Sequence, residues 1–495
     1  MTTLLAAAIS APHIDYVAIL PELILIGAAV VMMVGASLTP SRPPAGTWSA
    51  FTALASAGSL GAAWFQWDRV SHHGSFTTIA GSVAVDGYSE FFLILISVAV
   101  ALGSLVADDY LRREGLDGPE FYVLALLSGS GAMFLAVADD LIVVFLGLEV
   151  LSIALYVMAG YHTRRRESQE AAMKYFVLGA FSSAIFLYGI ALVYGATGSS
   201  NLVRIGQFLA TNVIVSNGVL LAGLSMLVIG LGFKVAAVPF HSWSPDVYQG
   251  SPTPVTGYMA AAAKAAGFAG LLRVLFSPFA LMRSDWQPIV TVLAAITLGV
   301  GAVVALVQSD VKRLLAYSSI NHAGFVLVGV AAGTTRGVSA ALYYLFTYTF
   351  MVIGSFAVVT LVGRRGDARH RLEDYRGLGR QRPVLAGVFA FLLLAQSGVP
   401  FTTGFLAKFY VIAAAMSASS YPLAILAILF AVVAAFYYLK LVLIMYSAPE
   451  AATDTAPAIP PAAGLVLALT SGFTLAFGLV PGLVVDFAHH ATLLF

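Results

Sequence analysis

The sequence predicts an all-α membrane protein with about 14 transmembrane helices, and three observations lead to this fold class. Of the 495 residues, 60% are hydrophobic and 10% are charged, and the mean hydropathy is +0.91, whereas soluble domains carry about 25% charged residues. Apolar runs of about 20 residues, enough to cross a bilayer core about 30 Å thick, recur along the chain. The alternating segments of about ten residues that build a membrane β-barrel are absent from the sequence.

Fourteen apolar runs follow one another in the chain, with short polar connections between them. They are 16–38, 47–66, 86–107, 119–138, 140–161, 170–196, 216–239, 252–275, 286–308, 312–333, 337–363, 383–414, 420–446 and 460–483. The first run lacks a basic segment before it, so we expect a membrane helix rather than a cleaved signal peptide.

The basic residues in the connections predict how the chain is oriented. An even number of runs places both ends of the chain on one face of the membrane. The connections on the opposite face hold 15 Lys and Arg residues, Arg42 among them, and those on the terminal face hold 5. The positive-inside rule therefore places both termini outside the cell. It places "GRRGDARHRLEDYRGLGRQRP" (363–383) in the cytoplasm, where we expect a solvated segment.

Two short stretches occur twice. "AAMKYF" (171–176) resembles "AALYYL" (340–345), and "AAVPFHSW" (236–243) resembles "SGVPFTTG" (397–404). Each "VPF" lies inside an apolar run, where a proline removes a backbone hydrogen bond and breaks or kinks the helix. Interrupted segments in corresponding positions of two halves are typical of the ion path of a transporter. We expect two repeated units with a broken helix each, the second inverted because five runs separate the breaks.

The 6 lysines and 19 arginines are distributed differently. Nearly every arginine lies in a connection or at the end of a run, whereas five lysines fall inside runs and Lys312 lies at an edge. Arginine stays protonated in proteins, but a buried lysine gives up its proton readily, so lysine can release a proton inside a membrane. The five are Lys174, Lys234, Lys264, Lys408 and Lys440. Lys440 lies close to the end of its run, where we expect its ammonium simply to reach the headgroups.

Three of these lysines are the predicted proton carriers. Lys264, in "GYMAAAAKAAGFAGLLRVLF", is about 12 residues, or roughly 18 Å, from either end of its run. A charge at that depth costs about 2.5 to 3.5 kcal/mol, so a functional reason is expected for it. Lys234 lies five residues before Pro239, and Lys408 lies eight residues after Pro400, so each is next to a predicted helix break.

One acid lies in the middle of a run. Glu149, in "DLIVVFLGLEVLSIALYVMAGY", is tolerable there only with a cationic partner or a bound proton. A Glu/Lys pair that forms and breaks would switch the lysine between its charged and neutral forms. Glu22 and Glu90 lie nearer the ends of their runs, and we expect them at the membrane interface.

Histidines and tyrosines supply weaker signals. His241, two residues after Pro239, and His322, in "AYSSINHAGF", are predicted as secondary proton carriers because imidazole titrates near neutral pH. The alternative for each is a structural core histidine, and the tyrosines of "ALYYLFTY" (341–348) are expected to pack. With no cysteine and no His/carboxylate cluster at metal-binding spacing, the chain is not expected to hold an iron–sulfur cluster or a metal. Redox chemistry would take place in another chain.

Five stretches carry charged residues, prolines and glycines in an order that matches a known family. They are "GLEVLSIALYVMAGY", "EAAMKYFVLGAFSSAIFLYG", "GFKVAAVPFHSWSPDVYQGSPTPVTGYMAAAAKAAGF", "KRLLAYSSINHAGF" and "SGVPFTTGFLAKFYV". Over about residues 120–445 the chain resembles the antiporter-like membrane subunits of respiratory complex I, and the NADH-quinone oxidoreductase subunit N family most closely. Lys408, where subunit M carries glutamate, and the absence of the long lateral helix of subunit L favour subunit N.

The resemblance implies a particular organisation and particular site residues. It implies inverted five-helix units in 119–275 and 286–447, after three N-terminal helices in 1–118 and before a last helix in 460–495. In the family, the residue matching Glu149 pairs with the one matching Lys234. Lys264 matches the central relay, Lys408 the lysine that leads toward the outside, Lys174 a lysine near the Glu/Lys pair, and His241 the histidine after the first break.

The resemblance also implies an activity, cofactors and partners. The chain would be a proton-translocating subunit of an NADH:quinone oxidoreductase, with NAD, FMN, iron–sulfur clusters and quinone bound by other subunits and no cofactor of its own. Expected partners are other complex I membrane subunits, especially the subunit M paralogue and the small subunits K and J, and the lipid bilayer, but no nucleic acid. The expected location is the plasma membrane of a bacterium, with multiple spans.

Three other functions fit parts of the sequence. A cation/proton antiporter subunit of the Mrp type shares the broken helices and lysines, but sodium would require more carboxylates than Glu149. A structural or assembly subunit without transport would be expected to lose its intramembrane charges. A transporter for an organic solute would need a substrate pocket, of which the sequence gives no sign.

Overall fold

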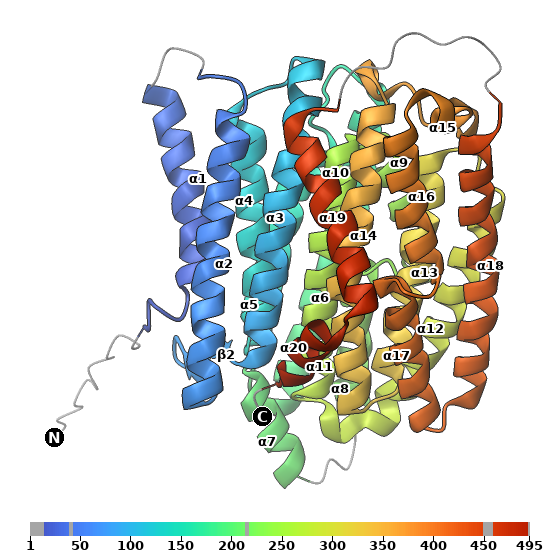
Figure 1. Cartoon of the computed structure of the whole chain (residues 1–495). Helices are drawn as coiled ribbons and strands as arrows, with labels where there is room; N and C mark the ends of the chain where they lie inside the picture. The colour runs from blue at the N-terminus through green and yellow to red at the C-terminus, as the bar shows by residue number, and fades with distance from the viewer. Residues whose placement is uncertain (1–13, 39–42, 213–216, 449–458, 494–495) are drawn as a thin grey trace, which may run out of the picture.

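The computed structural model describes residues 14–38, 43–212, 217–448 and 459–493. Arg42, which contributes to the predicted charge asymmetry, lies outside these ranges. The described residues form one bundle of long helices that stand side by side (Figure 1). The segment 364–382 lies at the top of that view, and we call this side the arginine-rich face. The last residues of the described chain lie near the bottom, and we call that side the terminal face.

Three helices and a short hairpin form the N-terminal section. The helices are α1 (Leu20–Leu38), α2 (Thr47–His73) and α3 (Gly87–Glu114), and the antiparallel strands are β1 (Phe76–Thr78) and β2 (Val83–Val85). The predicted all-α class is therefore incomplete, because the connection between α2 and α3 forms a hairpin. Strands of three residues contain too little alternation to be recognised in a sequence.

The first predicted unit contains a broken helix and one long buried helix. Its elements are α4 (Pro119–Val137), α5 (Leu141–Ala159), α6 (Arg166–Thr197), α7 (Leu202–Thr211), α8 (Gly218–Lys234), α9 (Trp243–Gly250), α10 (Thr253–Tyr258), the π-helical η1 (Met259–Ala263) and α11 (Lys264–Phe276). The predicted break at Pro239 is confirmed, since α8 ends at Lys234 and α9 begins at Trp243. Lys234 is thus the last residue of its half-helix. Helices α10, η1 and α11 follow one another without interruption, and π-helical turns are frequent at functional sites.

The second predicted unit contains the other break. Its elements and those that follow are η2 (Ala280–Met282), α12 (Arg283–Leu306), α13 (Val311–Ala331), α14 (Thr335–Val362), η3 (Arg365–Asp367), η4 (Leu372–Tyr375), α15 (Leu378–Gln381), α16 (Pro383–Ser397), α17 (Thr403–Ser417), α18 (Tyr421–Tyr446), α19 (Pro461–Leu479) and α20 (Gly482–His490). The break predicted at Pro400 is confirmed, because it lies between α16 and α17. Gly398 ends α16 with φ +95°, a left-handed conformation that suits glycine.

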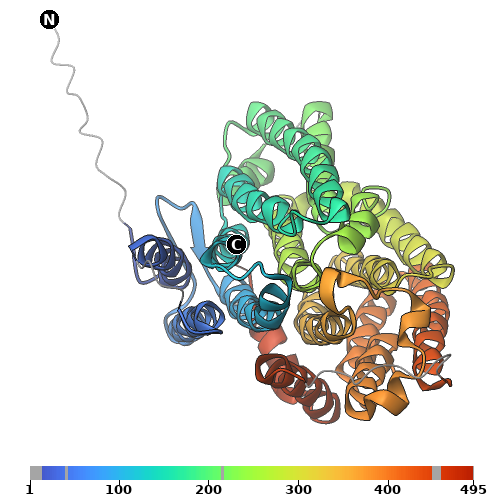
Figure 2. The same cartoon turned by 90° about the horizontal axis from the view of Figure 1, so that it is seen from above.

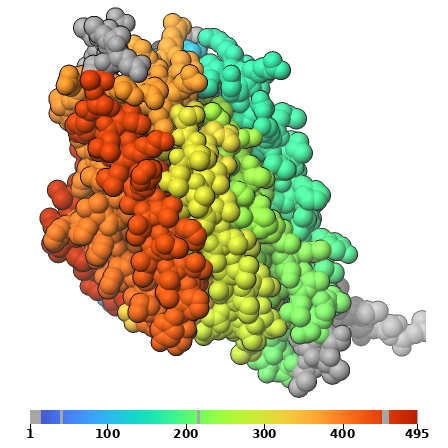
Figure 3. Space-filling model, turned by 90° about the vertical axis from the view of Figure 1, so that its right-hand side faces the viewer, coloured from blue at the N-terminus to red at the C-terminus, as the bar shows by residue number. Residues whose placement is uncertain are grey.

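Eleven of the described helices are long and apolar enough to cross a membrane, judged by length and composition. The half-helices α8, α16 and α17 are shorter because the breaks divide the predicted runs, and α2 is not among the eleven. The number of 14 spans, the inverted relation of the two units and the boundaries of the sections stay predictions. Helices α18, α12 and α6 contribute to one outer side of the bundle (Figure 3). Large apolar side chains of these helices are exposed, as expected of a surface that faces lipid or another membrane protein.

Three helices form the centre of the bundle. The helix α10–η1–α11, together with α13 and α14, is buried along almost its whole length. Seen along the helix axes, the N-terminal helices lie at one side, the yellow and orange helices of the second predicted unit lie at the other, and the dark red C-terminal helices lie near α3 (Figure 2). Lys264 and His322 are therefore carried by helices that are surrounded by protein.

The segment 364–382 is folded onto the bundle and is not the solvated loop that the sequence predicts. Asp367 is 1% exposed, and Leu372 and Tyr375 are also buried. Backbone hydrogen bonds attach the segment to the start of α13, from Val311 N to the carbonyl of His370 at 2.7 Å and from Leu372 N to the carbonyl of residue 309 at 2.9 Å. The segment is ordered because its carboxylate and apolar side chains find partners on the bundle.

Candidate functional site

Lys264 lies in the middle of the buried helix α10–η1–α11 and contacts α13. Its Nζ donates hydrogen bonds to the carbonyl and to the hydroxyl of Ser319, each at 2.5 Å. The residue is 3% exposed. Within the described ranges, Lys264 takes part in no ion pair with a carboxylate. This buried ammonium is therefore solvated by neutral oxygens.

Lys234, at the end of α8, points toward α5 and α6. Its Nζ donates to the Ser152 hydroxyl at 2.8 Å and to the Tyr175 hydroxyl at 3.3 Å. The pairing with Glu149 that the resemblance implies is not a direct contact: the charges interact at longer range, and Glu149 Oε1 has no hydrogen-bond partner in the described part of the chain. Ser152 follows Glu149 by three residues on the same side of α5, so Lys234 meets the hydroxyl instead of the carboxylate.

Lys408 lies in α17, next to the second break. Its Nζ donates to the carbonyl of Ser397 at 2.7 Å, and it lies 5.1 Å from the centre of the Phe325 ring. Ser397 is the last residue of α16, where carbonyls lack helical partners and the helix dipole is negative. A Cβ atom on Gly398 would lie 3.1 Å from Lys408 Cδ, so a glycine there leaves room for the lysine. The break thus creates the acceptor that holds Lys408.

Helix α13 connects Lys264 with Lys408. Ser319, His322 and Phe325 are spaced by three residues and therefore lie along one side of α13. Ser319 holds Lys264, Phe325 lies beside Lys408, and His322 lies between them. One helix thus touches two of the three buried lysines and carries a titratable group between them.

His322 is surrounded by tyrosines. Its Nδ1 lies 2.6 Å from the Tyr344 hydroxyl and its Nε2 lies 3.0 Å from the Tyr438 hydroxyl, and Tyr438 also contacts the Ser318 hydroxyl. Tyr344, which the sequence predicts as a packing residue, is therefore part of a polar network. The hydroxyl of Tyr348, whose ring packs on His322, has no hydrogen-bond partner among the described residues.

The remaining predicted carriers and acids lie elsewhere. His241 lies in the segment between α8 and α9, and its Nδ1 has no partner in the ranges that the structure describes. Glu22 and Glu90, expected at the interface, are 0% and 1% exposed, in the first turns of α1 and α3. Their four carboxyl oxygens likewise lack partners among the described residues. These acids are buried because neighbouring N-terminal helices pack over the ends of α1 and α3.

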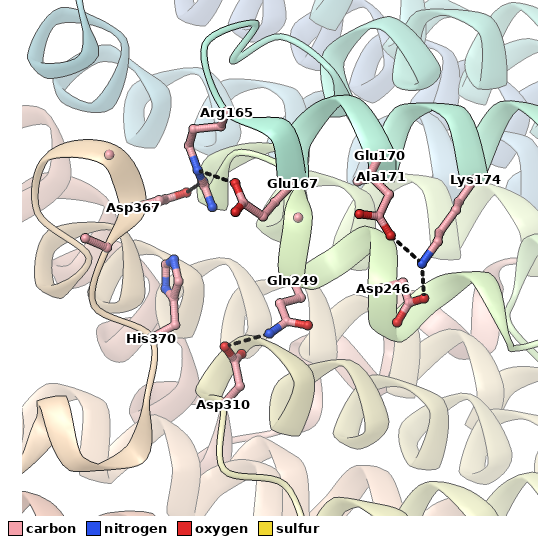
Figure 4. Close-up of a pocket in the computed structure, with 13 residues that line it drawn as sticks. Arg165, Glu167, Glu170, Ala171, Lys174, Asp246, Gln249, Asp310, Asp367 and His370 are labelled. Atoms are coloured by element: carbon pink, nitrogen blue, oxygen red, sulfur yellow. Dashed lines mark hydrogen bonds and ion pairs between the residues drawn. The ribbon is translucent and has the colours of Figure 1, made fainter.

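Lys174 lies in a pocket on the arginine-rich face. The pocket, of about 410 Å³, is bounded by α6, α9 and the segment that contains η3 (Figure 4). Lys174 Nζ lies 2.7 Å from Asp246 Oδ2 and 2.8 Å from Glu170 Oε1, and Arg313 Nη1 lies 2.6 Å from Asp246 Oδ1. Burial by itself would raise the pKa of the Asp246 carboxyl, but hydrogen bonds from Lys174 and Arg313 lower it below its usual value. The Lys174 side chain is 41% exposed, and its ion-pair partners are the two acids Asp246 and Glu170 that line the same pocket.

Asp367 forms the inner end of the pocket. Its Oδ2 lies 3.1 Å from Arg165 Nη1 and 3.7 Å from Lys312 Nζ, and its carboxylate accepts hydrogen bonds from the backbone and hydroxyl of Thr253 at 3.2 and 3.0 Å. Burial alone would raise the pKa of Asp367, but the charge of Lys312 lowers it, with Arg165 contributing. Lys312, expected at an edge, is fully buried. Asp367 therefore binds the start of the helix that carries Lys264.

Arg273 forms a second buried ion pair near the terminal face. Its Nη2 lies 3.1 Å from Asp86 Oδ1 and 2.8 Å from the Ser89 hydroxyl, and both charged residues are 0% exposed. Arg273 is nevertheless buried at this face, because α3 and α4 cover the last turn of α11. Burial raises the pKa of the nearby Asp139 to about 6, although the charge of Arg273 opposes this. Neither Asp139 carboxyl oxygen has a partner among the described residues.

Sequence reasoning did not single out several polar residues of this site. They are Ser152, Tyr175, Ser319, Tyr438, Asp246 and Asp367. A signal existed for Ser319, since it precedes His322 by three residues in a buried helix. The others contact residues that are at least 55 positions away in the chain, for example Asp367 with Lys312 at 55 and Ser152 with Lys234 at 82. Within the described residues, no group of three or more His, Cys, Asp or Glu could hold a metal ion.

Comparisons with known proteins place this geometry in a family. Residues 138–434 match the family model described as NADH:quinone oxidoreductase/Mrp antiporter, TM. NADH-quinone oxidoreductase subunit N of Trichlorobacter lovleyi is 42% identical over 416 residues, which are 84% of this chain and 85% of that protein. A chain of respiratory complex I from Thermus thermophilus with bound Aureothin is 36% identical, with a TM-score of 0.79 over 94% of this chain and 98% of that one.

A chain of the Mrp complex from Dietzia sp. DQ12-45-1b has the same fold. The TM-score is 0.84 over 96% of each chain, but the identity is 20%. This likeness concerns the fold alone.

Proposed function

Because this chain belongs to the NADH:quinone oxidoreductase/Mrp antiporter family, with subunit N proteins among its relatives over most of its length, we propose that Lys234, Lys264 and Lys408 carry protons across the membrane. The chain is a membrane subunit of an NADH-quinone oxidoreductase. Electron transfer takes place in other subunits of such a complex. The role of this chain is then to convert a change of charge in the neighbouring subunits, caused by electron transfer, into proton movement across the membrane.

One observation carries the proposal: three lysines are buried in the bundle, and no carboxylate of the described residues is in direct contact with them. Their acceptors are the hydroxyls of Ser152, Tyr175 and Ser319 and the carbonyls of Ser319 and Ser397. An opposite charge at 4 Å would stabilise an ammonium by about 4 kcal/mol at an effective dielectric constant of 20. Without that charge, the neutral form of lysine is accessible, and the residue can release a proton and accept another.

The contacts suggest an order in which protons move. Lys264 and Lys408 are linked through α13, where His322 and its tyrosine partners lie between them. Lys234 lies on the other side of Lys264, and Glu149 acts on it at a distance. A shift of charge near Glu149 would favour or disfavour the protonated form of Lys234, and the next lysine would respond to that charge in turn.

We also propose the orientation and the surroundings of the chain. The arginine-rich face would be cytoplasmic and both termini external, in the plasma membrane of a bacterium, as the positive-inside rule requires. Each of the two units would be an inverted copy of the other. The exposed apolar sides of the bundle would contact lipid and the membrane subunits M, K and J of the complex.

The decisive experiment replaces Lys264 in the assembled complex. Lys264→Met removes the charge, and Lys264→Arg keeps a charge that does not dissociate. Proton pumping by vesicles, NADH oxidation and assembly of the complex are measured together. We expect both variants to assemble and neither to pump normally. Normal pumping by an assembled Lys264→Arg complex would show that position 264 needs only a positive charge and does not transfer protons.

A sodium test separates this function from that of an Mrp-type antiporter. Sodium would need several carboxylate or carbonyl oxygens around one position. Among the described residues, Lys234, Lys264 and Lys408 each contact at most one carbonyl, with one or two hydroxyls or none and no carboxylate, so pumping should be the same in sodium-free and sodium-containing medium. A requirement for sodium would favour the antiporter function.

A further inference from the structure

His370, at the inner end of the pocket on the arginine-rich face, has no role in the proton route described so far. It lines the pocket and lies across it from the helix that carries Glu167 (Figure 4). It is 8% exposed, and neither ring nitrogen has a hydrogen-bond partner in the described part of the chain. The side chains of Glu167 and Glu170 are 67% and 60% exposed, so the outer end of the pocket meets the solution. Buried polar atoms without protein partners usually bind water, so water from the pocket is expected to reach this imidazole.

Charged groups from several elements surround His370. Lys312 belongs to α13, Arg165 precedes α6, Asp367 lies in η3, and Asp310 lines the pocket from the start of α13. Burial, and then the charge of Lys312, lower the pKa of His370 to about 3, and Asp367 opposes the shift. His370 is therefore neutral at physiological pH, with one ring nitrogen that can accept a proton and one that carries a proton. Loss of the charge on Lys312 would make His370 a better proton acceptor.

From Lys312, polar side chains lead toward Lys264. Lys312 Nζ donates to the carbonyl of Ser251 at 2.6 Å. The row continues along one side of α9: Tyr248 and Ser244 lie three and seven residues before Ser251, which directly follows that helix. The hydroxyls of Ser251 and Ser244 are buried and unpartnered among the described residues, and the Tyr248 hydroxyl lies next to those of Ser244 and Ser319. The last member, Ser319, holds Lys264.

Because the unpartnered hydroxyls of Ser251 and Ser244 can hold water between the other members of this row, we propose that the row is a second proton-uptake path, which leads from the pocket past His370 and Lys312 to Lys264. The path rests on the proposed function, since it requires Lys264 to carry protons, and it does not pass Glu149 or Lys234. One ring nitrogen of His370 takes a proton from hydronium and leaves water. The other ring nitrogen then gives its proton, through water, to Lys312 in its neutral form, and His370 returns to the neutral state.

Chemical rescue tests the path. His370→Ala removes the imidazole beside a pocket that is large enough for free imidazole. We expect the assembled variant complex to pump severalfold more slowly and to recover when imidazole is added. Pumping is followed as membrane potential in vesicles, because neutral imidazole crosses membranes and dissipates a pH gradient. The wild-type complex with the same imidazole gives the reference rate.

The matched control is His162→Ala. His162 is also a buried histidine on the arginine-rich face, but it contacts Glu114 and does not line the pocket. Added imidazole should not change the pumping rate of the His162→Ala complex. If His370→Ala does not assemble, His370→Gln keeps a polar side chain without a titrating nitrogen, and its pumping rate should also fall.

The outcomes separate the uptake path from the proposed function. Normal pumping by His370→Ala or His370→Gln would overturn the path, and so would a loss of pumping in His370→Ala that imidazole does not restore. If Lys264→Met fails to pump while the His370 variants pump normally, the proposed function stands and only the path falls. Normal pumping by Lys264→Met would overturn both.

Discussion

The buried cations near the two faces of the bundle and those in its interior are held in different ways. Near the faces, Arg273 contacts Asp86, and Lys312 contacts Asp367. In the interior, the ammonium groups of Lys234, Lys264 and Lys408 donate hydrogen bonds only to hydroxyls and carbonyls of the described chain. All five cations are at most 5% exposed, so burial does not distinguish the two groups.

The difference teaches which charges hold the structure and which can change. Removing one partner of a buried ion pair leaves an unpaired charge and costs about 3 to 5 kcal/mol. Removing an unpaired buried charge leaves nothing uncompensated, and it relieves a membrane cost of about 2.5 to 3.5 kcal/mol. Arg273, which stays charged, is therefore expected to matter for stability, and the unpaired lysines for proton transfer. Lys312 combines both roles, because its partner is a carboxylate but its ammonium can give up a proton.

The largest effect is expected for Arg273→Met. The variant removes the cation that contacts the buried Asp86 carboxylate and should lose about 3 to 5 kcal/mol of stability, measured by thermal unfolding of the purified complex. The double variant Asp86→Asn/Arg273→Met removes both charges, and asparagine still caps the start of α3. It should regain most of the loss. A single variant as stable as the wild type would show that this pair does not hold α11 to α3.

A large effect on function, without one on stability, is expected for Lys408. Lys408→Met and Lys408→Arg should each lower the pumping rate by about 100-fold, the lower end of what a positioned proton carrier contributes. Lys408→Met should be at least as stable as the wild type, because it removes an intramembrane charge. Pumping is measured in vesicles and stability by thermal unfolding. Near-normal pumping by Lys408→Arg would place Lys408 among the structural cations.

A smaller, pH-dependent effect is expected for Asp139. Its pKa is raised from 3.8 to about 6, first by burial, so between these values the folded state binds more protons than the unfolded state. Stability then falls as the pH rises through this range and stays lower above it. Asp139→Asn should gain about 1 to 3 kcal/mol at pH 7.5 and almost nothing at pH 4. Thermal unfolding at the two pH values measures this. A larger gain at pH 4 would contradict the sign of the shift.

The smallest effect is expected for Lys174, whose ion pairs are partly exposed. Lys174→Met should change the stability by about 1 kcal/mol or less, because exposed ion pairs contribute little. Pumping should stay within about twofold of the wild type, since the side chain reaches the solution and not an interior lysine. A loss of pumping as large as that of Lys408→Met would place Lys174 among the proton carriers.

The sequence predicted the breaks and the three interior lysines because both depend on local properties. A proline within an apolar run prevents a regular helix wherever the run packs, and Pro239 and Pro400 do so here. A lysine near the middle of such a run lies inside the membrane regardless of its neighbours, as Lys264 does. The hairpin β1–β2 escaped prediction because its strands of three residues have no recognisable period.

What the sequence by itself determined is the succession of apolar helices, the two breaks, the depth of the interior lysines and the membership of the family. Only the tertiary structure decided what each charge touches. Lys234 meets Ser152 rather than Glu149, Asp367 folds inward onto Lys312, and α13 joins two lysines from different helices. The reason is physical. Helix formation depends on neighbours within one or two turns, whereas the partner of a buried charge depends on the packing of helices that are far apart in the chain.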